Sequence, residues 1–204
     1  MNMVKAEVKI CGLSRIEDIE VVNNEKPDYI GFVFAESRRK VTPQRALELR
    51  QLLHPSIIPV GVFVNEQIED IVKIVKSGAI DIIQLHGVED EAYIQRLKSQ
   101  IDNQIIKAIP VQNEGDVQKW NHTTADYLLL DHQTGGTGES FNWDLIGKTS
   151  KPFFLAGGLH SQNVAAAIKK TLPFAVDVSS GVETNGLKDS EKIVEFIRRS
   201  QNEY

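Results

Sequence analysis

Cysteine is nearly absent from this chain of 204 residues. Cys11 is the single cysteine, so no disulfide can form within the chain. Small extracellular proteins often depend on disulfides, whereas proteins of reducing compartments do not. We therefore expect a soluble protein of the cytoplasm.

Long apolar runs and extended basic runs are also missing. No apolar run approaches the roughly 20 residues that a membrane helix needs, and residues 1–7 lack the apolar core of a signal peptide. The formal net charge is −5, and no basic run exceeds Arg38-Arg39-Lys40. We expect neither a membrane nor a nucleic acid as partner. Because no His, Cys or carboxylate residues stand at metal-ligand spacing, we also expect no metal site and no cofactor.

Eight short apolar runs organise the chain at fairly regular intervals. Two of them, residues 29–34 and 58–64, are apolar almost throughout, as are strands buried on both faces of a parallel sheet. The segments between the runs are predicted to be helices, which gives an α/β fold. The eight runs begin near Ala6, Asp28, Ile57, Asp81, Gln104, Asp126, Pro152 and Phe174.

Eight strand–helix units favour a closed (β/α)8 TIM barrel over a doubly wound sheet, although a miscount by one strand would restore the second alternative. The chain has 204 residues, whereas such barrels typically have about 250. We therefore expect a barrel of minimal size. No linker interrupts the chain, so residues 1–204 are predicted to form a single domain.

Several helix boundaries are predicted from capping signals. Ser14-Arg15-Ile16-Glu17 has the pattern of a capping box, and Thr42-Pro43 offers a cap followed by proline at the first helical position. Asn65 is expected to cap a helix that Gly78 ends, and Ser161 to cap a later one.

Glycine-bearing turns follow the last two apolar runs. Gly157-Gly158 comes after residues 152–156, and Ser180-Gly181 comes shortly after residues 174–178. Such turns expose backbone N–H groups, and barrels commonly bind phosphate between the loops after strands 7 and 8. We predict a phosphate site at these four residues. The alternative is that the glycines only close tight turns.

Cys11 and Asp131 stand at the predicted C-terminal ends of strands 1 and 6, where barrel enzymes keep their active sites. A thiolate can act as a general base if positive charge lies nearby. A carboxyl group in apolar surroundings can stay protonated and act as a general acid. The alternatives are a small buried hydrophobic residue for Cys11 and a turn or capping residue for Asp131.

Other polar residues at the same predicted end are assigned lesser roles. Arg38 or Arg39 could bind a carboxylate of an acidic substrate, although at least one of them is expected to be solvated. His86 is interpreted as structural, and Lys107 as capping the barrel or pairing with a carboxylate. The glycine-rich segment 131–141 is predicted to be a flexible loop that covers the substrate.

The chain resembles the phosphoribosylanthranilate isomerase family, the (β/α)8 enzymes of tryptophan biosynthesis, along its whole length. Together and in order, the matching motifs are highly specific. They are Lys9-Ile10-Cys11-Gly12, Gly31-Phe32-Val33-Phe34, Gly61-Val62-Phe63-Val64-Asn65, Gln84-Leu85-His86-Gly87, Leu130-Asp131, Gly135-Gly136-Thr137-Gly138, Phe141-Asn142-Trp143, Gly157-Gly158-Leu159 and residues 176–183.

The resemblance implies an Amadori rearrangement of N-(5′-phosphoribosyl)anthranilate by general acid–base catalysis. It implies that Cys11 is the general base and Asp131 the general acid, and that Arg39 binds the anthranilate carboxylate. Because residues 35–39 lack a proline and form a loop one residue shorter than in some members, Arg38 is a possible replacement. Asp177 is assigned only to the substrate pocket.

The resemblance also implies phosphate binding by the backbone around Gly157, Gly158, Ser180 and Gly181. In this motif Ala156 replaces a serine that is frequent in the family. Two other functions stay open from the residues alone: a different phosphosugar barrel enzyme, such as an epimerase or aldolase, and a barrel that binds a phosphorylated ligand without turnover. We expect a monomer or a homodimer.

Overall fold

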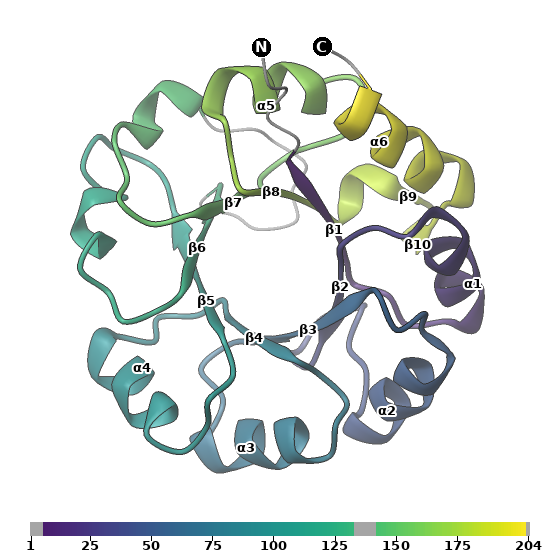
Figure 1. Ribbon diagram of the computed structural model, residues 1–204, viewed down its shortest axis with the longest axis horizontal. Helices are drawn as coiled ribbons and strands as arrows, with labels where there is room; N and C mark the ends of the chain where they lie inside the picture. The colour runs from purple at the N-terminus through teal and green to yellow at the C-terminus, as the bar shows by residue number, and fades with distance from the viewer. Residues whose placement is uncertain (1–5, 133–141, 203–204) are drawn as a thin grey trace.

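The structure is a computed structural model that describes residues 6–132 and 142–202. Eight parallel strands form a closed ring, with the helices arranged around its outside (Figure 1). The strands are β1 (Glu7–Cys11), β2 (Tyr29–Val33), β3 (Ile58–Phe63), β4 (Ile82–Leu85), β5 (Ile105–Pro110), β6 (Tyr127–Asp131), β7 (Phe153–Leu155) and β8 (Ala175–Val178). The ring closes because β1 pairs with both β2 and β8. This confirms the predicted barrel and excludes the doubly wound sheet.

The helices that cover the barrel follow six of the eight strands. They are α1 (Ile16–Glu25), α2 (Pro43–Leu52), α3 (Ile68–Lys76), α4 (Glu91–Lys98), α5 (Val164–Thr171) and α6 (Ser190–Asn202). In α6, Ile193, Phe196 and Ile197 are buried on one face, as predicted. No helix in the described ranges is long and apolar enough to cross a membrane.

The expectation of a helix between the strands is wrong after β5, while after β6 a loop was predicted over residues 131–141. Within the described residues, β5 and β6 are followed only by short 3-10 helices, η1 (Gln118–Trp120) and η2 (Trp143–Ile146). Before η1, the Asp116 carboxylate accepts the N–H groups of Gln112 and Asn113 and so favours a turn. After η2, Gly147 has a φ of 60° and stops the chain from continuing as a helix.

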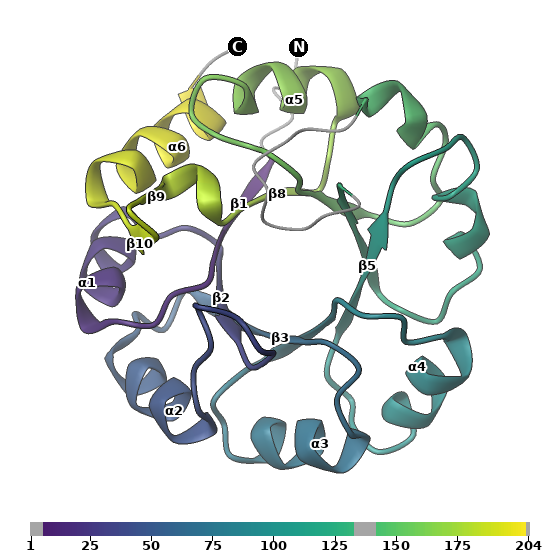
Figure 2. The same cartoon turned by 180° about the vertical axis from the view of Figure 1, so that it is seen from behind.

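A small insertion separates β8 from α6. It consists of the 3-10 helix η3 (Ser180–Val182) and the antiparallel pair β9 (Glu183–Thr184) and β10 (Leu187–Lys188). The pair lies beside α1 and α6 when the ring is seen from either side (Figures 1 and 2). Arg15 anchors it to the start of α1, because its Nη2 donates to the Lys188 carbonyl oxygen at 2.8 Å.

Two of the predicted helix caps are confirmed. Thr42 accepts the Arg45 N–H at 3.1 Å at the start of α2, and Gly78, with a φ of 78°, follows the end of α3. Ser14 does not cap α1. Instead the Asp18 carboxylate, within the first turn, accepts the N–H groups of Ser14 and Arg15 at 3.0 Å each.

The caps predicted at Asn65 and Ser161 are wrong. Asn65 lies before the start of α3 with a φ of 53°, and its side chain accepts the Val88 N–H at 2.8 Å. Helix α5 begins only at Val164, because Asn163 accepts the His160 N–H and holds residues 160–163 in a turn. In both places a polar side chain accepts a backbone N–H group of a loop, and not one at the start of a helix.

Strand residues alternate between two apolar clusters, as the period of two requires. The larger cluster packs against the helices and includes Ile105 and Ile109, whereas Ile106 and Ala108 belong to a second cluster, which the barrel encloses. The enclosed residues change in character along the strands. On β4, the apolar Ile82 is followed by the polar Gln84. The polar residues therefore gather toward the C-terminal ends of the strands.

Candidate active site

Cys11 is the last residue of β1, and its neighbours are polar and charged. The residue is only 7% exposed, and a Cβ atom at Gly31, its register partner on β2, would lie 2.6 Å from the thiol sulfur. The glycine therefore leaves the space that the thiol occupies. Two residues earlier on the same strand, the fully buried Lys9 donates its Nζ to Asp177 Oδ1 at 2.9 Å.

Burial and charge act in opposite directions on the thiol. Burial raises the pKa of Cys11, while the positive charges of Lys9 and Lys188 oppose this rise without cancelling it. Burial alone would lower the pKa of Lys9, but Asp177 and Cys11 outweigh it and the pKa is raised. Lys9 therefore stays charged beneath the thiol, and the thiolate depends on Lys9 and Lys188 to form.

Asp131 ends β6 and has two partners that hold its carboxylate. Oδ1 accepts the N–H of His132 at 2.7 Å, and Oδ2 lies 3.3 Å from Nε2 of His86. The other ring nitrogen of His86, Nδ1, lies 2.8 Å from Nε2 of the buried Gln84. Sequence reasoning missed this role of His86, although its place just after β4 indicated the same end of the barrel.

Cys11 and Asp131 lie at the same end of the molecule. Both are the last residues of parallel strands in one closed ring, so both stand at its C-terminal end. Each also follows an enclosed residue by two positions, Lys9 on β1 and Leu129 on β6, which places both side chains on the inner face. The topology thus brings together the two residues that were predicted as base and acid.

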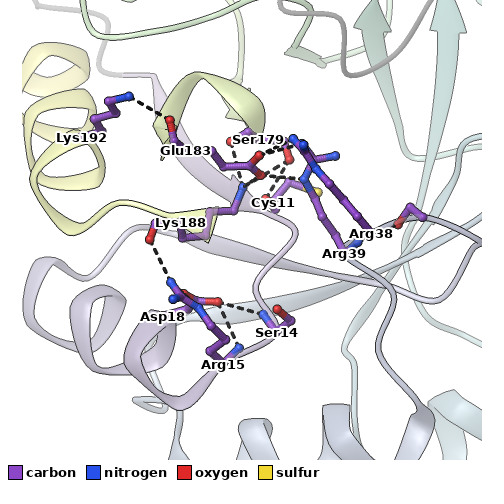
Figure 3. A network of polar contacts seen from close by, with 11 residues as sticks. Cys11, Ser14, Arg15, Asp18, Arg38, Arg39, Ser179, Glu183, Lys188 and Lys192 are labelled. Carbon is purple, nitrogen blue, oxygen red and sulfur yellow. Dashed lines mark hydrogen bonds and ion pairs between the residues drawn. The ribbon is translucent and has the colours of Figure 1, made fainter. Parts of the chain in front are cut away.

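A network of charged groups centred on Glu183 lies beside Cys11 (Figure 3). Arg39 donates Nε to Glu183 Oε1 at 2.6 Å and Nη2 to Oε2 at 3.0 Å, and Arg38 donates Nη2 to Oε2 at 2.7 Å. Lys188 donates Nζ to Oε1 at 2.8 Å. One carboxylate therefore holds three cations in place.

Burial distinguishes the two arginines. The Arg38 side chain is 58% exposed, whereas that of Arg39 is 16% exposed and passes so close to Gly12 that a Cβ atom there would lie 2.5 Å from Arg39 Cδ. Against the opposing effect of burial, hydrogen bonds from Arg39 and Lys188 lower the pKa of Glu183 to about 2. Sequence reasoning found both arginines but assigned no role to Glu183 or Lys188.

Lys188 and Ser179 connect this network to β1. Lys188 Nζ donates to the Ser179 carbonyl oxygen at 2.8 Å, and Ser179 Oγ donates to the Cys11 carbonyl oxygen at 3.1 Å. Burial lowers the pKa of Lys188, and Glu183 only partly offsets this effect. The side chain that binds Glu183 thus also lies near the backbone of Cys11.

The two turns predicted to bind phosphate lie against each other. A Cβ atom at Gly181 would lie 1.9 Å from the Leu159 carbonyl oxygen, so glycine is needed for this contact. Gly157 and Gly158 have φ angles of 78° and 63°. In the part of the chain that the structure describes, the N–H groups of Gly158, Ser180 and Gly181 donate to no protein acceptor. The pair of turns can therefore offer several N–H groups to one anion.

The remaining predicted residues occupy other positions. Asp177 lies against Lys9, and Lys107 pairs with Glu89 at 2.9 Å, as expected for a lysine with a carboxylate partner. In the loop predicted to cover the substrate, residues 133–141 lie outside the described ranges. Over residues 6–132 and 142–202, no group of three or more His, Cys, Asp or Glu side chains is arranged to hold a metal ion.

The chain is similar to known proteins along nearly its whole length. Residues 8–199 match the family described as N-(5′phosphoribosyl)anthranilate (PRA) isomerase. The N-(5′-phosphoribosyl)anthranilate isomerase of Endomicrobium trichonymphae is 48% identical over 196 residues, covering 94% of this chain and 96% of the relative. The crystal structure of the Thermotoga maritima phosphoribosyl anthranilate isomerase superposes with a TM-score of 0.87 at 37% identity, over 96% of this chain and 98% of that one.

A further solved structure shows an isomerase with a bound compound. It is a phosphoribosyl anthranilate isomerase in complex with reduced 1-(o-carboxyphenylamino)-1-deoxyribulose 5-phosphate. It is 36% identical, has a TM-score of 0.84 and covers 96% of this chain and 98% of its own.

Proposed function

The chain belongs to the N-(5′-phosphoribosyl)anthranilate isomerase family, and we propose that Cys11 and Asp131 carry the acid–base chemistry of its reaction. The reaction is an aldose–ketose isomerisation in tryptophan biosynthesis, in which N-(5′-phosphoribosyl)anthranilate becomes 1-(2-carboxyphenylamino)-1-deoxyribulose 5-phosphate. The observation that supports the two roles is their shared position. Both side chains stand on the inner face of the barrel at its C-terminal end.

In the proposed mechanism, protonated Asp131 donates its proton to the ribose ring oxygen, and the C1–O bond breaks to give an iminium ion. The Cys11 thiolate then removes the proton from C2, and the electron pair moves to give an enolamine. Tautomerisation of the enolamine yields the ketone. Lys9 and Lys188 stabilise the thiolate that the second step requires, because both oppose the effect of burial on the thiol.

Arg39 is the residue proposed to bind the anthranilate carboxylate. Glu183 binds its Nε and Nη2 and so fixes the plane of the guanidinium group, while in the described residues Nη1 has no acceptor. A guanidinium held in this way can offer its remaining N–H groups to a carboxylate. The exposed Arg38 is the less suitable candidate, because most of its side chain faces solvent.

The phosphate group is proposed to bind at the turns containing Gly157, Gly158, Ser180 and Gly181. Their contact through Gly181 and the N–H groups without protein acceptors support this assignment. The solved isomerase with a bound 5-phosphate supports the same class of ligand. Asp177 is assigned to the pocket through its ion pair with Lys9.

Two substitutions test the catalytic assignment. Cys11→Ala and Asp131→Asn are each expected to lower kcat by at least about 100-fold, the low end for loss of a general acid or base. Circular dichroism and thermal unfolding would establish that both variants are folded. Near-full activity in either folded variant would contradict the role proposed for that residue. Trapping of a substrate on a lysine by borohydride would instead indicate an aldolase.

The physiological setting is part of the proposal. We place the protein in the cytoplasm, as a monomer or a homodimer. A solved relative whose name describes monomers made from a dimeric isomerase of Thermotoga maritima supports considering both states. Sedimentation equilibrium of the purified chain would decide between them.

A further inference from the structure

Gln84 is a buried polar residue whose hydrogen bonding is incomplete. It is 1% exposed, and its inner-face position on β4 is followed two residues later by His86. Its Nε2 lies 2.8 Å from His86 Nδ1, whereas its Oε1 has no hydrogen-bond partner within the described part of the chain. Buried polar atoms are nearly always paired, so an unpaired one calls for an explanation.

The position of the amide nitrogen determines which ring nitrogen of His86 carries a proton. An amide NH2 group can only donate, so Nδ1 must accept, and the proton of a neutral ring must be on Nε2. Nε2 faces Asp131 Oδ2 at 3.3 Å. In this arrangement the protonated Nε2 can donate to Asp131, which suits the charged carboxylate.

Rotating the amide by 180° gives a second arrangement with the opposite polarity. Oε1 then takes the place of Nε2 and accepts a hydrogen bond from Nδ1, and if the ring is neutral its Nε2 can only accept. A hydrogen bond to Asp131 then requires the carboxylic acid form, which donates to the ring. This arrangement holds one proton more than the first. Since 29% of the His86 side chain is exposed, solvent can supply that proton.

We propose that Gln84 is a positioning residue whose amide reverses as Asp131 gains or loses its proton, so that His86 supports both forms of the carboxyl group. The unpaired Oε1 is explained because it becomes the acceptor in the second arrangement. The proposal rests on the function assigned to Asp131. Other charged groups near this point are Lys107 and Glu89, which are paired with each other at 2.9 Å.

The wild-type protein provides the direct test. The 15N shifts of the His86 ring, measured over a range of pH, report which nitrogen is protonated. We expect a neutral ring throughout, with the proton on Nε2 at high pH and on Nδ1 once Asp131 is protonated. A ring that carries protons on both nitrogens in that step would overturn the proposal. His54, His122 and His160 serve as internal controls, because His132 itself contacts Asp131. A proton fixed on Nδ1 at all pH values, or an Nδ1 that does not follow Asp131, would overturn the proposal.

Two variants test the consequence for turnover. Gln84→Met cannot donate and accepts only weakly, and Gln84→Glu presents only acceptors when ionised. We expect each to lower kcat about tenfold, a part of the 10²–10⁴ that a general acid contributes, with KM changed less than about twofold and a shifted pH profile. Gln104→Met, at an exposed glutamine, is the control and should match the wild type.

The role of Asp131 and the role of Gln84 can be disproved separately. If Asp131→Asn keeps its activity, the assigned function of Asp131 is wrong, whatever the state of His86. If Asp131→Asn is inactive but both Gln84 variants keep the wild-type pH profile, only the role of Gln84 is wrong.

Discussion

One carboxylate at this site, Glu183, holds several cations. Its side chain is 5% exposed and binds Arg38, Arg39 and Lys188. Removing one partner of a buried ion pair leaves an uncompensated charge, which costs far more than an exposed pair contributes. Glu183 therefore orients the guanidinium group of Arg39 and compensates the positive charge of Lys188.

The low pKa of Glu183 predicts a specific dependence of stability on pH. Its pKa is about 2 in the folded protein, below its value in the unfolded chain of about 4.3. Its ionisation therefore stabilises the fold fully above the unfolded pKa, and this contribution is lost as pH falls from about 5 to about 2, amounting to about 3 kcal/mol. The Glu183→Gln variant lacks this contribution. Urea unfolding should show that the difference in free energy of unfolding between the wild type and the variant shrinks over this range.

Glu48→Gln is a suitable control for that experiment. Glu48 pairs with Arg45 on α2, and its side chain is 50% exposed, so its ionisation affects stability little. A difference between wild type and Glu183→Gln that stays constant from pH 7 to about pH 2 would contradict the assigned ion pairs.

Among the structural elements, the turns after β7 and β8 depend on each other for their position. The contact between them runs from Gly181 to the Leu159 carbonyl oxygen. Gly181→Ala would place a methyl group against backbone that cannot move aside as a side chain could. We expect a loss of about 1–3 kcal/mol in stability, as for overpacking, and a raised KM, because the N–H groups proposed to bind phosphate move apart. Steady-state kinetics and urea unfolding measure both effects.

Gly78→Ala separates crowding from backbone strain. A Cβ atom at Gly78 would meet nothing within 4 Å, but its φ of 78° is unfavourable for alanine. This variant should lose about 1–2 kcal/mol through strain alone, with KM unchanged. Equal increases in KM for both variants would argue against a phosphate site at Gly181.

The elements could be predicted from sequence where local signals determine them. Eight strands and their order follow from the apolar runs, and the Thr42 cap follows from its neighbour Pro43. The caps at Ser14 and Ser161 were wrong because another local side chain is the acceptor in each place, whereas Asn65 accepts the N–H of Val88 from a different loop. At α1 the acceptor is Asp18, and before α5 it is Asn163. Such competition depends on side-chain positions that spacing alone does not reveal.

The candidate site was predictable only in part, for a related reason. Cys11, Asp131 and Arg39 stand at strand ends or in loops where position along the chain indicates position in the barrel. Glu183 acts through contacts with distant segments, and Gln84 reaches Asp131 only through His86. The bond from Arg39 to Glu183 joins residues 144 positions apart. No periodicity or motif spacing encodes such a pair.

Across the whole molecule, the inside of the barrel is divided into an apolar part and a polar part. Tyr29, Tyr127 and Phe174 surround Phe154 with ring centroids 5.4 to 5.7 Å apart. Lys9, Gln84 and Asp177 lie further along the strands, toward the end that holds Cys11 and Asp131. In barrels, residues at the C-terminal end serve catalysis and those at the other end serve stability.

This division predicts that stability and turnover can be changed separately. Phe154 is fully buried, so Phe154→Ala should lower the free energy of unfolding by about 3–5 kcal/mol. The kcat of the folded variant should stay within about twofold of the wild type, because the ring packs among Tyr29, Tyr127 and Phe174 at the apolar end of the barrel. Phe154→Leu, which conserves more volume, should cost about 1.5 kcal/mol or less. Urea unfolding and kinetics well below the Tm of each variant measure the two effects. A large fall in kcat with little loss of stability would show that the apolar end positions the acid and base, because then the two parts of the barrel would not be independent.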